Sequence, residues 1–250
     1  MKEIKTSSLA SSGELDQRKK FFELYKKNPI PSSEQLAAIS LYLKRQDLMK
    51  VLFFNELYQE IVDTHGIIIE FGCRWGQNLV TLSNLRSIHE PYNYNRKILG
   101  FDTFSGFKNI HEKDGQNEII AEGAFSTTED YDSYLVDVLE YHESESPLNH
   151  IRKFEVIKGD AVVQLEQYLE KHPETLIAFA WFDFDIFDPT FKCLNLIRSY
   201  LTKGSIIGFD ELNDPKFPGE TTALKEVLGL ADVRIQRNKY SGMQSYIKFE

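Results

Sequence analysis

The sequence predicts an α/β protein whose mostly parallel sheet is covered by helices on both faces. Short apolar runs alternate with segments of helical periodicity through most of the 250 residues. The runs are apolar at consecutive positions, as in strands buried on both faces, whereas a half-exposed antiparallel strand would alternate apolar and polar residues. Hydrophobic residues make up 42% of the chain and charged residues 27%, so a disordered or fibrous protein is excluded.

The N-terminal segment 1–63 is expected to be a helical extension, and the sheet domain is expected at 64–250. Apolar residues from 14 to 63 have helical spacing that Pro29 and Pro31 interrupt, which predicts two or three helices. We expect a packed helical cap, which could be a lid over an acceptor or a contact between subunits. Its expected buried stripe is Leu41, Leu48, Val51, Leu52 and Leu57.

The expected strands and helices follow in turn after residue 66. The β-branched run 67–71 predicts a strand, and a glycine-containing turn and a helix come after it. Further strands are expected at 98–101, 154–157, 176–182 and 205–209, helices at 131–142, 161–171 and 189–201, and two closing strands within 233–250. The polar stretches 91–97 and 109–130 predict loops, and the second is long enough to be a lid or an acceptor-recognition element.

Charge and cysteine content exclude several classes of protein. The 29 basic and 38 acidic residues give a formal charge of −9, so the surface should repel nucleic acid. Cys73 and Cys193 are too few for a disulfide scaffold or a thiolate zinc site and indicate a reducing cytoplasm. No apolar run is long enough to cross a bilayer, so no membrane partner is expected.

Acidic residues follow the first three expected strands, at the sheet edge where open parallel sheets bind ligands. Glu70 precedes a turn whose glycines, Gly72 and Gly76, have the spacing GxxxG, which departs from the GxGxxG of dinucleotide sites. Asp102 is placed to bind a ribose diol or to cap a helix, and Asp160 to cap a helix or to reach an exocyclic amine. Three acids at three strand ends favour one nucleoside-bearing ligand that lies across the sheet.

Carboxylates also follow the fourth and fifth strands. Asp183 and Asp185 leave a strongly apolar run and, two residues apart on an extended chain, face the same way at roughly 6–7 Å. Asp210 and Glu211 follow the next strand. Three oxygen ligands at neighbouring strand ends suit Mg²⁺, although Asp210 and Glu211 could also be ordinary turn residues.

In their order along the chain, these motifs resemble the macrocin-type sugar O-methyltransferases over roughly residues 54–230. The resemblance rests on the acid-Phe-Gly turn with Arg-Trp-Gly at 70–76, Phe-Asp-Thr-Phe at 101–104, Asp-x-Asp at 183–185 and Asp-Glu at 210–211. The peptides 54–58, 90–94 and 215–221 are similar to the branch that methylates TDP-rhamnose in calicheamicin biosynthesis.

The resemblance implies a class I methyltransferase fold, which is a Rossmann-like three-layer αβα sandwich with a seven-stranded, mostly parallel sheet and a final antiparallel strand. It also implies S-adenosylmethionine as cofactor, a sugar or sugar-nucleotide acceptor, and a homo-oligomer. The implied cofactor contacts are Glu70, Gly72, Arg74, Trp75 and Gly76 for the methionine part, Asp102 for the ribose, Asp160 for the adenine amine, and Thr103, Phe104 and Gly159 beside them. The implied Mg²⁺ ligands are Asp183, Asp210 and Glu211, where the family usually has two aspartates at the last pair.

Asp185 is the candidate base that takes the proton of a sugar hydroxyl. Catechol methyltransferases have a lysine three residues after the first aspartate, and here that position is Ile186, which favours a sugar acceptor. Three alternatives stay open: an amino-sugar N-methyltransferase, a metal-dependent hydrolase on the same carboxylates, and a binder that has lost its reaction. Weaker candidates for ligand contact are His111 and the aromatic residues Trp75, Phe104, Tyr92 and Tyr94.

Overall fold

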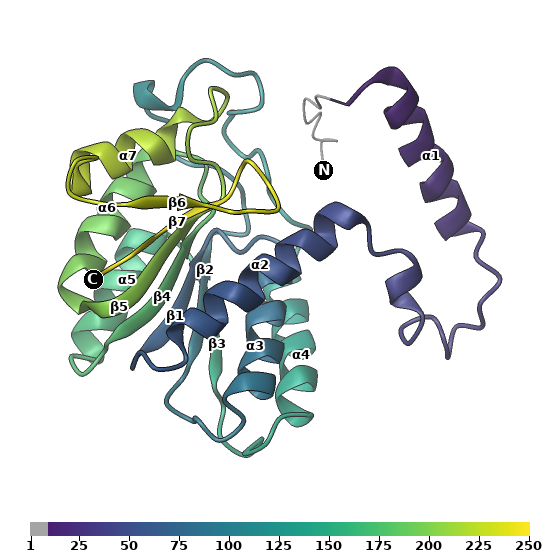
Figure 1. Cartoon of the computed structure of the whole chain (residues 1–250), viewed down its shortest axis with the longest axis horizontal. Coiled ribbons are helices and arrows are strands. Elements are labelled where there is room, and N and C mark those ends of the chain that lie inside the picture. Colours follow the sequence, from purple (N-terminus) through teal and green to yellow (C-terminus); the bar gives the residue numbers. More distant parts are fainter. Residues whose placement is uncertain (1–9) are drawn as a thin grey trace. The chain divides into compact units, whose positions relative to one another are not determined.

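The computed structural model describes residues 10–250 and contains a seven-stranded sheet between two layers of helices (Figure 1). The order of the strands is β3-β2-β1-β4-β5-β7-β6, and β7 runs antiparallel to both of its neighbours. The strands are β1 (Ile67–Phe71), β2 (Ile98–Asp102), β3 (Phe154–Lys158), β4 (Ile177–Phe182), β5 (Leu201–Phe209), β6 (Ile235–Arg237) and β7 (Ser245–Lys248). This confirms the predicted class I methyltransferase fold.

Helices cover both faces of the sheet (Figure 1). One layer holds α2 (Arg45–Ile61), α3 (Gln77–His89) and α4 (Tyr131–Ser144), and the other holds α5 (Ala161–Lys171), α6 (Phe187–Ile197) and α7 (Pro218–Leu228). The sequence did not predict α7, because Pro218 and Gly219 at its start are typical of turns, although proline is well tolerated in a first helical turn. The helix expected at 189–201 ends at Ile197, and its last residues belong to the 3₁₀ turn η3 (Arg198–Tyr200) and to β5.

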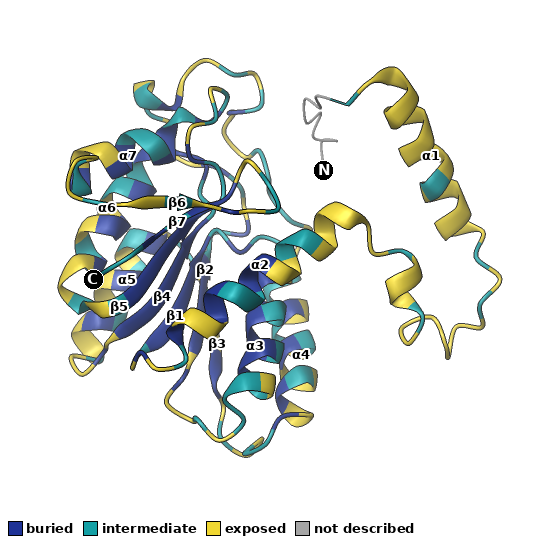
Figure 2. Ribbon diagram, viewed as in Figure 1, coloured by how far each residue is buried: buried dark blue, intermediate teal, exposed yellow. Residues whose placement is uncertain are grey.

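Alternate side chains of the strands supply two apolar cores, one on each face of the sheet. Ile69, Phe71 and Phe182 pack with residues of α5, α6 and α7. Ile68 and Trp181 pack on the other face with residues of α2, α3 and α4. Figure 2 shows the central strands as a continuous buried layer. Burial on both faces explains why the strands read as uninterrupted apolar runs.

Residues 10–52 belong to a separate unit with little core of its own. It contains α1 (Ser12–Lys26), which Ser11 and Glu14 cap reciprocally, and the 3₁₀ turn η1 (Ile39–Leu41). None of residues 10–52 is buried. Of the expected stripe, Leu57 is buried in the part of α2 that packs on the sheet, whereas Leu41, Leu48, Val51 and Leu52 are exposed. The packed cap stays a prediction.

The compact unit that holds the sheet begins at Phe53, earlier than the boundary expected after residue 63. The division into a lid at 1–63 and a cofactor-binding domain at 64–250 stays a prediction.

The long stretch between β2 and α4 is an anchored loop. It contains the 3₁₀ turn η2 (Glu112–Asp114), and its residues Phe107 and Ile120 share a small apolar core with Ile186 and Phe217. The loop is thereby fixed to the segments that follow β4 and β5. Within residues 10–250, no helix combines the length and the apolar character needed to span a membrane.

Candidate active site

The turn after β1 lies at the point where the strand order reverses, between β2 and β4. Gly72 has a φ of +81°, and a Cβ there would lie 2.0 Å from the carbonyl oxygen of Asp183. Gly76 also has a positive φ, and a Cβ there would lie 2.3 Å from Leu135 Cδ1. Both glycines are therefore required for the close approach of β1 to β4 and of α3 to α4.

Glu70 is fully buried at the end of β1, and its Oε1 accepts a hydrogen bond from Asn78 Nδ2 at 2.7 Å. Asn78 lies in the first turn of α3, so the first helix after the turn fixes the carboxylate. The main chain of Trp75, in the turn itself, accepts a hydrogen bond from Tyr131 Oη at 2.9 Å, and the two rings meet edge to face.

Asp102 joins the turns after β1 and β2. Its Oδ2 accepts from the backbone N–H of Arg74 at 2.7 Å, and its Oδ1 accepts from that of Phe104 at 2.6 Å. Burial raises the pKa of Asp102, and these two hydrogen bonds and Arg74 oppose the rise. It does not cap a helix. Each carboxylate oxygen still has a second lone pair for a ligand hydroxyl.

The residues beside Asp102 shape the same edge of the sheet. Thr103 Oγ1 donates to the carbonyl of Gly106 at 3.1 Å, which closes the turn. Phe104 has a positive φ of 54° and a buried ring that packs in the core beside α3. The amide of Gly159 donates to the carbonyl of Asp102 at 2.9 Å, so the end of β3 lies against that of β2.

Asp160 is the N-cap of α5. Its Oδ1 accepts from the backbone N–H groups of Val162 at 2.9 Å and Val163 at 3.3 Å. The capping alternative is thus confirmed, and a contact with an adenine amine stays a prediction for its exposed carboxylate.

Five carboxylates gather after β4 and β5. Asp185 is buried with a left-handed φ of 62°, and burial raises its pKa, as do Glu211 and Asp183 beside it. Glu220 is also buried, and its pKa is raised by burial and then by Asp183, Glu211 and Asp210. The raised pKa values of Asp185 and Glu220 indicate repulsion from the neighbouring acids. Such repulsion favours a bound proton or cation at this place.

No group of three or more His, Cys, Asp or Glu side chains within residues 10–250 is arranged to hold a metal ion. Asp210 Oδ1 accepts from Gln244 Nε2 at 3.1 Å, which ties the end of β5 to the start of β7. The predicted ligands Asp183, Asp210 and Glu211 therefore share one region without forming a ready three-ligand set.

Arg74 is a cation that interacts with two of these acids, Asp183 and Asp185. Burial lowers the pKa of its guanidinium, whereas Asp183, Asp185 and Asp102 act to raise it. The guanidinium lies over the rings of Trp75 and Phe125, at 5.5 and 5.0 Å from their centroids. Phe125 belongs to the long loop, so Arg74 links that loop to the turn after β1.

Three weaker candidates have other surroundings. Tyr92 and Tyr94 are exposed beside the start of β2, at the opposite end of the sheet from the turns that carry the acids, so they lie away from the candidate site. His111 Nδ1 accepts from the amide of Lys113 at 3.1 Å, which gives the imidazole a local capping role.

No protein-family model and no curated protein sequence matches the chain. Among solved structures, one described as CalS11, calicheamicin methyltransferase, is 35% identical, with a TM-score of 0.93 over 99% of this chain and 97% of that one. An apo structure of CalS11, described as TDP-rhamnose 3'-O-methyltransferase, is 33% identical, with a TM-score of 0.85 over 99% of both chains. The chain belongs to this sugar O-methyltransferase family.

The O-methyltransferase NovP is 13% identical, with a TM-score of 0.58 over 80% of this chain and 79% of that one, and this likeness supports the fold alone. The match with CalS11 covers nearly the whole length of both chains.

Sequence reasoning missed two buried acids of this methyltransferase. Glu220, in α7, accepts hydrogen bonds from the amides of Phe184 and Asp185, and Asp114, in the long loop, accepts one from the amide of Phe187. Neither follows a strand, so inspection of the strand ends did not find them. A signal was present for Glu220, which lies in the peptide 215–221 that resembles the TDP-rhamnose branch.

Proposed function

We propose that the chain transfers the methyl group of S-adenosylmethionine to a hydroxyl of a deoxyhexose, carried by a nucleotide or by a natural-product glycoside. The observation that carries this proposal is the cluster of carboxylates after β4 and β5, in a chain of the CalS11 family. The relative's description as a TDP-rhamnose 3'-O-methyltransferase supports a nucleotide-linked deoxyhexose as the first acceptor to try.

The methyl donor would lie across the ends of β1, β2 and β3. Glu70 and the turn at 72–76 would hold the methionine part, and the buried carboxylate of Glu70 suits a ligand with a cationic group. Asp102 would accept the ribose hydroxyls through its remaining lone pairs, with Thr103 and Phe104 beside it. Gly159 and the exposed carboxylate of Asp160 would border the adenine.

The acids after β4 and β5 fit Mg²⁺ by their chemistry. They are hard oxygen donors, their mutual repulsion raises the pKa values of Asp185 and Glu220, and a divalent cation would relieve that repulsion. Mg²⁺ is often held by one or two carboxylates, with waters and substrate completing its ligands, so a ready three-ligand set is not required. Asp183, Asp210 and Glu211 would hold it, and when bound it would lower the pKa of the acceptor hydroxyl.

Asp185 would take the proton as the sugar oxygen attacks the methyl group. Its raised pKa suits a general base, because a base works best when its pKa lies near the working pH. The left-handed backbone at Asp185 turns the chain directly after Asp183 and so sets the carboxylate beside Asp183 and Glu211. No covalent enzyme intermediate is needed, since the oxygen attacks the methyl carbon directly.

Calorimetric titration with S-adenosylhomocysteine tests the donor site. We expect stoichiometric binding by the wild type and a weaker affinity for Asp102→Ala. Absence of binding by the wild type, with or without Mg²⁺, would contradict a methyltransferase role and favour hydrolysis on the same carboxylates. The acceptor is then sought by mass spectrometry with TDP-linked deoxyhexoses, with an amino sugar in parallel to detect N-methylation.

We further propose that the chain works as a homo-oligomer in the cytoplasm. Large apolar side chains of the N-terminal unit are exposed, among them Phe22, Leu24, Leu36, Ile39 and Leu41, and a second copy would cover such a surface. Two buried free thiols, Cys73 and Cys193, are compatible with a reducing compartment. Light scattering of the wild type and of Leu36→Ser/Leu41→Ser tests the assembly, and a monomeric wild type would contradict it.

A further inference from the structure

The turn between β4 and α6 has backbone amides that need acceptors from elsewhere in the chain. Asp185 is left-handed, with a φ of 62°, and Ile186, the N-cap of α6, offers no side-chain hydrogen bond to the helix. The first amides of a helix have no acceptor within the helix itself. The turn that carries Asp185 is therefore held by contacts from outside its own segment.

Two carboxylates from distant segments supply those contacts. Glu220 Oε1, in the first turn of α7, accepts from the amides of Phe184 at 3.0 Å and Asp185 at 3.3 Å. Asp114 Oδ1, at the end of η2, accepts from the amide of Phe187 at 2.5 Å. Together they bracket Asp185 on its N-terminal and C-terminal sides.

Both carboxylates are buried and accept their hydrogen bonds from backbone amides. Asp114 and Glu220 are each 0% exposed, and within residues 10–250 neither forms an ion pair with a lysine or arginine. Burial of a carboxylate without a counter-ion is costly, so hydrogen bonds to amides must offset the cost.

Gly219 brings the three segments together. A Cβ at this position would lie 2.6 Å from Asp114 Oδ1 and 2.6 Å from the amide nitrogen of Phe187. Only glycine lets the start of α7 approach both η2 and the turn this closely. The hydrogen bond between Asp114 and Phe187 therefore forms where η2, the turn before α6 and the start of α7 meet.

We propose that Asp114 and Glu220 are positioning residues that hold the turn 184–187 and thereby set the carboxylate of Asp185 for catalysis. The proposal rests on the proposed function, in which Asp185 takes the proton of the acceptor. Asp114 Oδ2 also accepts from the amide of His111 at 2.7 Å, at the start of η2. The long loop and the catalytic turn are therefore one hydrogen-bonded unit.

The hydrogen bonds predict opposite outcomes for two conservative substitutions. Both oxygens of Asp114 accept from amides, so the NH₂ group of Asn would meet an N–H donor at one of them. Glu220 Oε1 accepts both of its hydrogen bonds, and Oε2 has no partner, so Gln keeps both acceptor contacts and its NH₂ group meets no competing donor. Asp114→Asn should therefore lose a hydrogen bond to a backbone amide, whereas Glu220→Gln should keep both of its hydrogen bonds.

The test measures kcat, the affinity for S-adenosylhomocysteine and the amide hydrogen exchange of peptides that cover 182–190, all on the full chain. Asp114→Asn and Glu220→Ala should lower kcat by about tenfold or more, because small misplacements of catalytic groups are costly. Their affinities for S-adenosylhomocysteine should stay within about twofold of the wild type, because the donor residues lie at other strand ends. Both variants should exchange the turn amides faster, and Glu220→Gln should restore kcat and slow exchange.

Ser205→Ala is the control for loss of stability away from the turn. Ser205 is buried in β5 and donates to the carbonyl of Ile177 at 2.7 Å, at the opposite end of β4 from the turn 184–187. We expect it to lower Tm and to leave kcat unchanged. A fall of kcat in Ser205→Ala equal to that in Asp114→Asn would overturn the positioning role.

Hydrogen exchange separates this proposal from the proposed function, because it needs no turnover. If the wild type methylates no sugar but Asp114→Asn and Glu220→Ala still expose the turn amides, the proposed function is wrong. The proposal that Asp114 and Glu220 hold the turn 184–187 is then still supported. Unchanged exchange in both variants, or equal effects of Glu220→Gln and Glu220→Ala, would overturn the proposal.

Discussion

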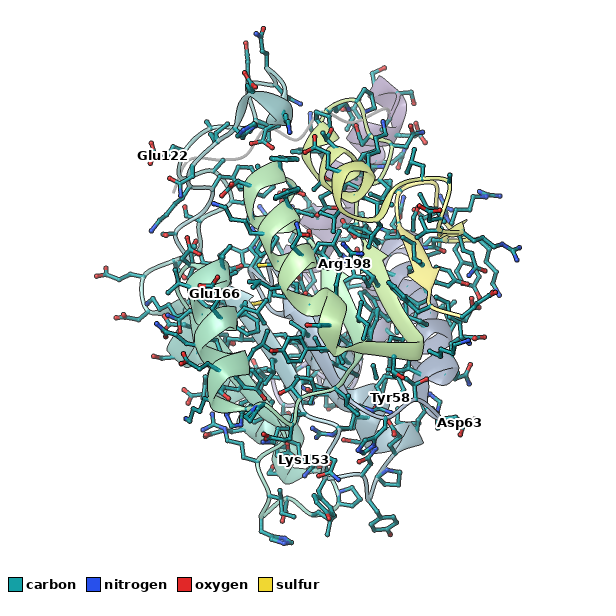
Figure 3. All side chains as sticks on the ribbon, turned by 90° about the vertical axis from the view of Figure 1, so that its left-hand side faces the viewer. Tyr58, Asp63, Glu122, Lys153, Glu166 and Arg198 are labelled. Atoms are coloured by element: carbon teal, nitrogen blue, oxygen red, sulfur yellow. The ribbon has the colours of Figure 1, made fainter. Side chains whose placement is uncertain are left out.

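The two ends of the sheet treat buried charge in opposite ways. Before β1, β2 and β3, buried cations and anions are paired: Arg96 bonds Glu90, and both Arg86 and Lys153 bond Glu143. After β4 and β5, the buried carboxyls of Asp185 and Glu220 have pKa values that are raised by burial and then by neighbouring acids. Figure 3 labels Tyr58 and Lys153, from the paired end, on the lower part of the molecule.

At the paired end, the buried guanidinium of Arg96 and hydroxyl of Tyr58 have hydrogen-bond partners. Arg96 donates to Glu90 and to the carbonyls of Ile61, Thr64 and Gly66, and Tyr58 Oη donates to Glu90 at 2.6 Å. Such a network fixes the entry of β1 and β2 and leaves no charge for a ligand. At the other end, Asp185 and Glu220 are buried beside further acids, and carboxylates with pKa values raised in this way are typical of functional sites.

The largest expected effect is on activity, at the end of the sheet where the acids follow β4 and β5, here called the acidic end. Asp185→Asn should lower kcat by about 10²–10⁴-fold, because the amide cannot take the proton of the acceptor. Affinity for S-adenosylhomocysteine should be unchanged in the same preparation. A variant with at least half of the wild-type kcat, measured by formation of methylated sugar, would show that Asp185 is not the base.

The paired end should instead respond in stability. Arg96→Met leaves Glu90 buried without its cation and should lower the free energy of unfolding by about 3–5 kcal/mol. Urea denaturation measures the loss, and folded Arg96→Met should bind S-adenosylhomocysteine like the wild type. A loss below about 1 kcal/mol would mean that the pair behaves like an exposed one.

Acid should weaken the same end. Burial acts to raise the pKa of Glu90, but hydrogen bonds from Arg96, Tyr58 and Asn93 outweigh it and lower that pKa. A carboxyl with a lowered pKa in the folded state adds stability above its unfolded pKa, and the contribution is lost as pH falls through the folded value. From about pH 5 downwards, Glu90→Gln should therefore lose less unfolding free energy than the wild type. Parallel urea curves for the two proteins against pH would refute this.

The smallest effect separates two roles of Asp160. Asp160→Ala removes the N-cap of α5 and should cost about 1 kcal/mol, whereas Asp160→Ser retains a capping oxygen and should cost a few tenths. Both variants lack the carboxylate proposed to border the adenine. Equal and weaker affinities for S-adenosylhomocysteine in the two variants would support that contact, and wild-type affinity in both would assign Asp160 to capping alone.

Local pattern was enough to predict the fold and most of the acidic end. Buried parallel strands are uninterrupted apolar runs, so the ends of β1 to β5, and with them Glu70, Asp102 and Asp183, could be located from the sequence. In the tail, β6 and β7 lie within the range 233–250 where two closing strands were expected.

Long-range contacts could not be predicted in this way. Asp114 lies 73 residues before its partner Phe187, and Glu220 lies 36 residues after Phe184, so neither pair has a local signature. For the face from Leu41 to Leu52, helical periodicity shows that it is apolar and does not show what covers it. Tyr92 and Tyr94 lie in a loop before β2, at the opposite end of the sheet from the strand ends that carry the acids.

The most direct measurement incubates the protein with S-adenosylmethionine, Mg²⁺ and TDP-rhamnose and follows the sugar nucleotide by mass spectrometry. We expect the wild type to form a product heavier by one CH₂ group. This product should be nearly absent with Asp185→Asn. Methylated product formed equally by Asp185→Asn would contradict the assignment of the acidic end as the catalytic one. Release of the sugar or of phosphate without methylation would contradict the proposed function.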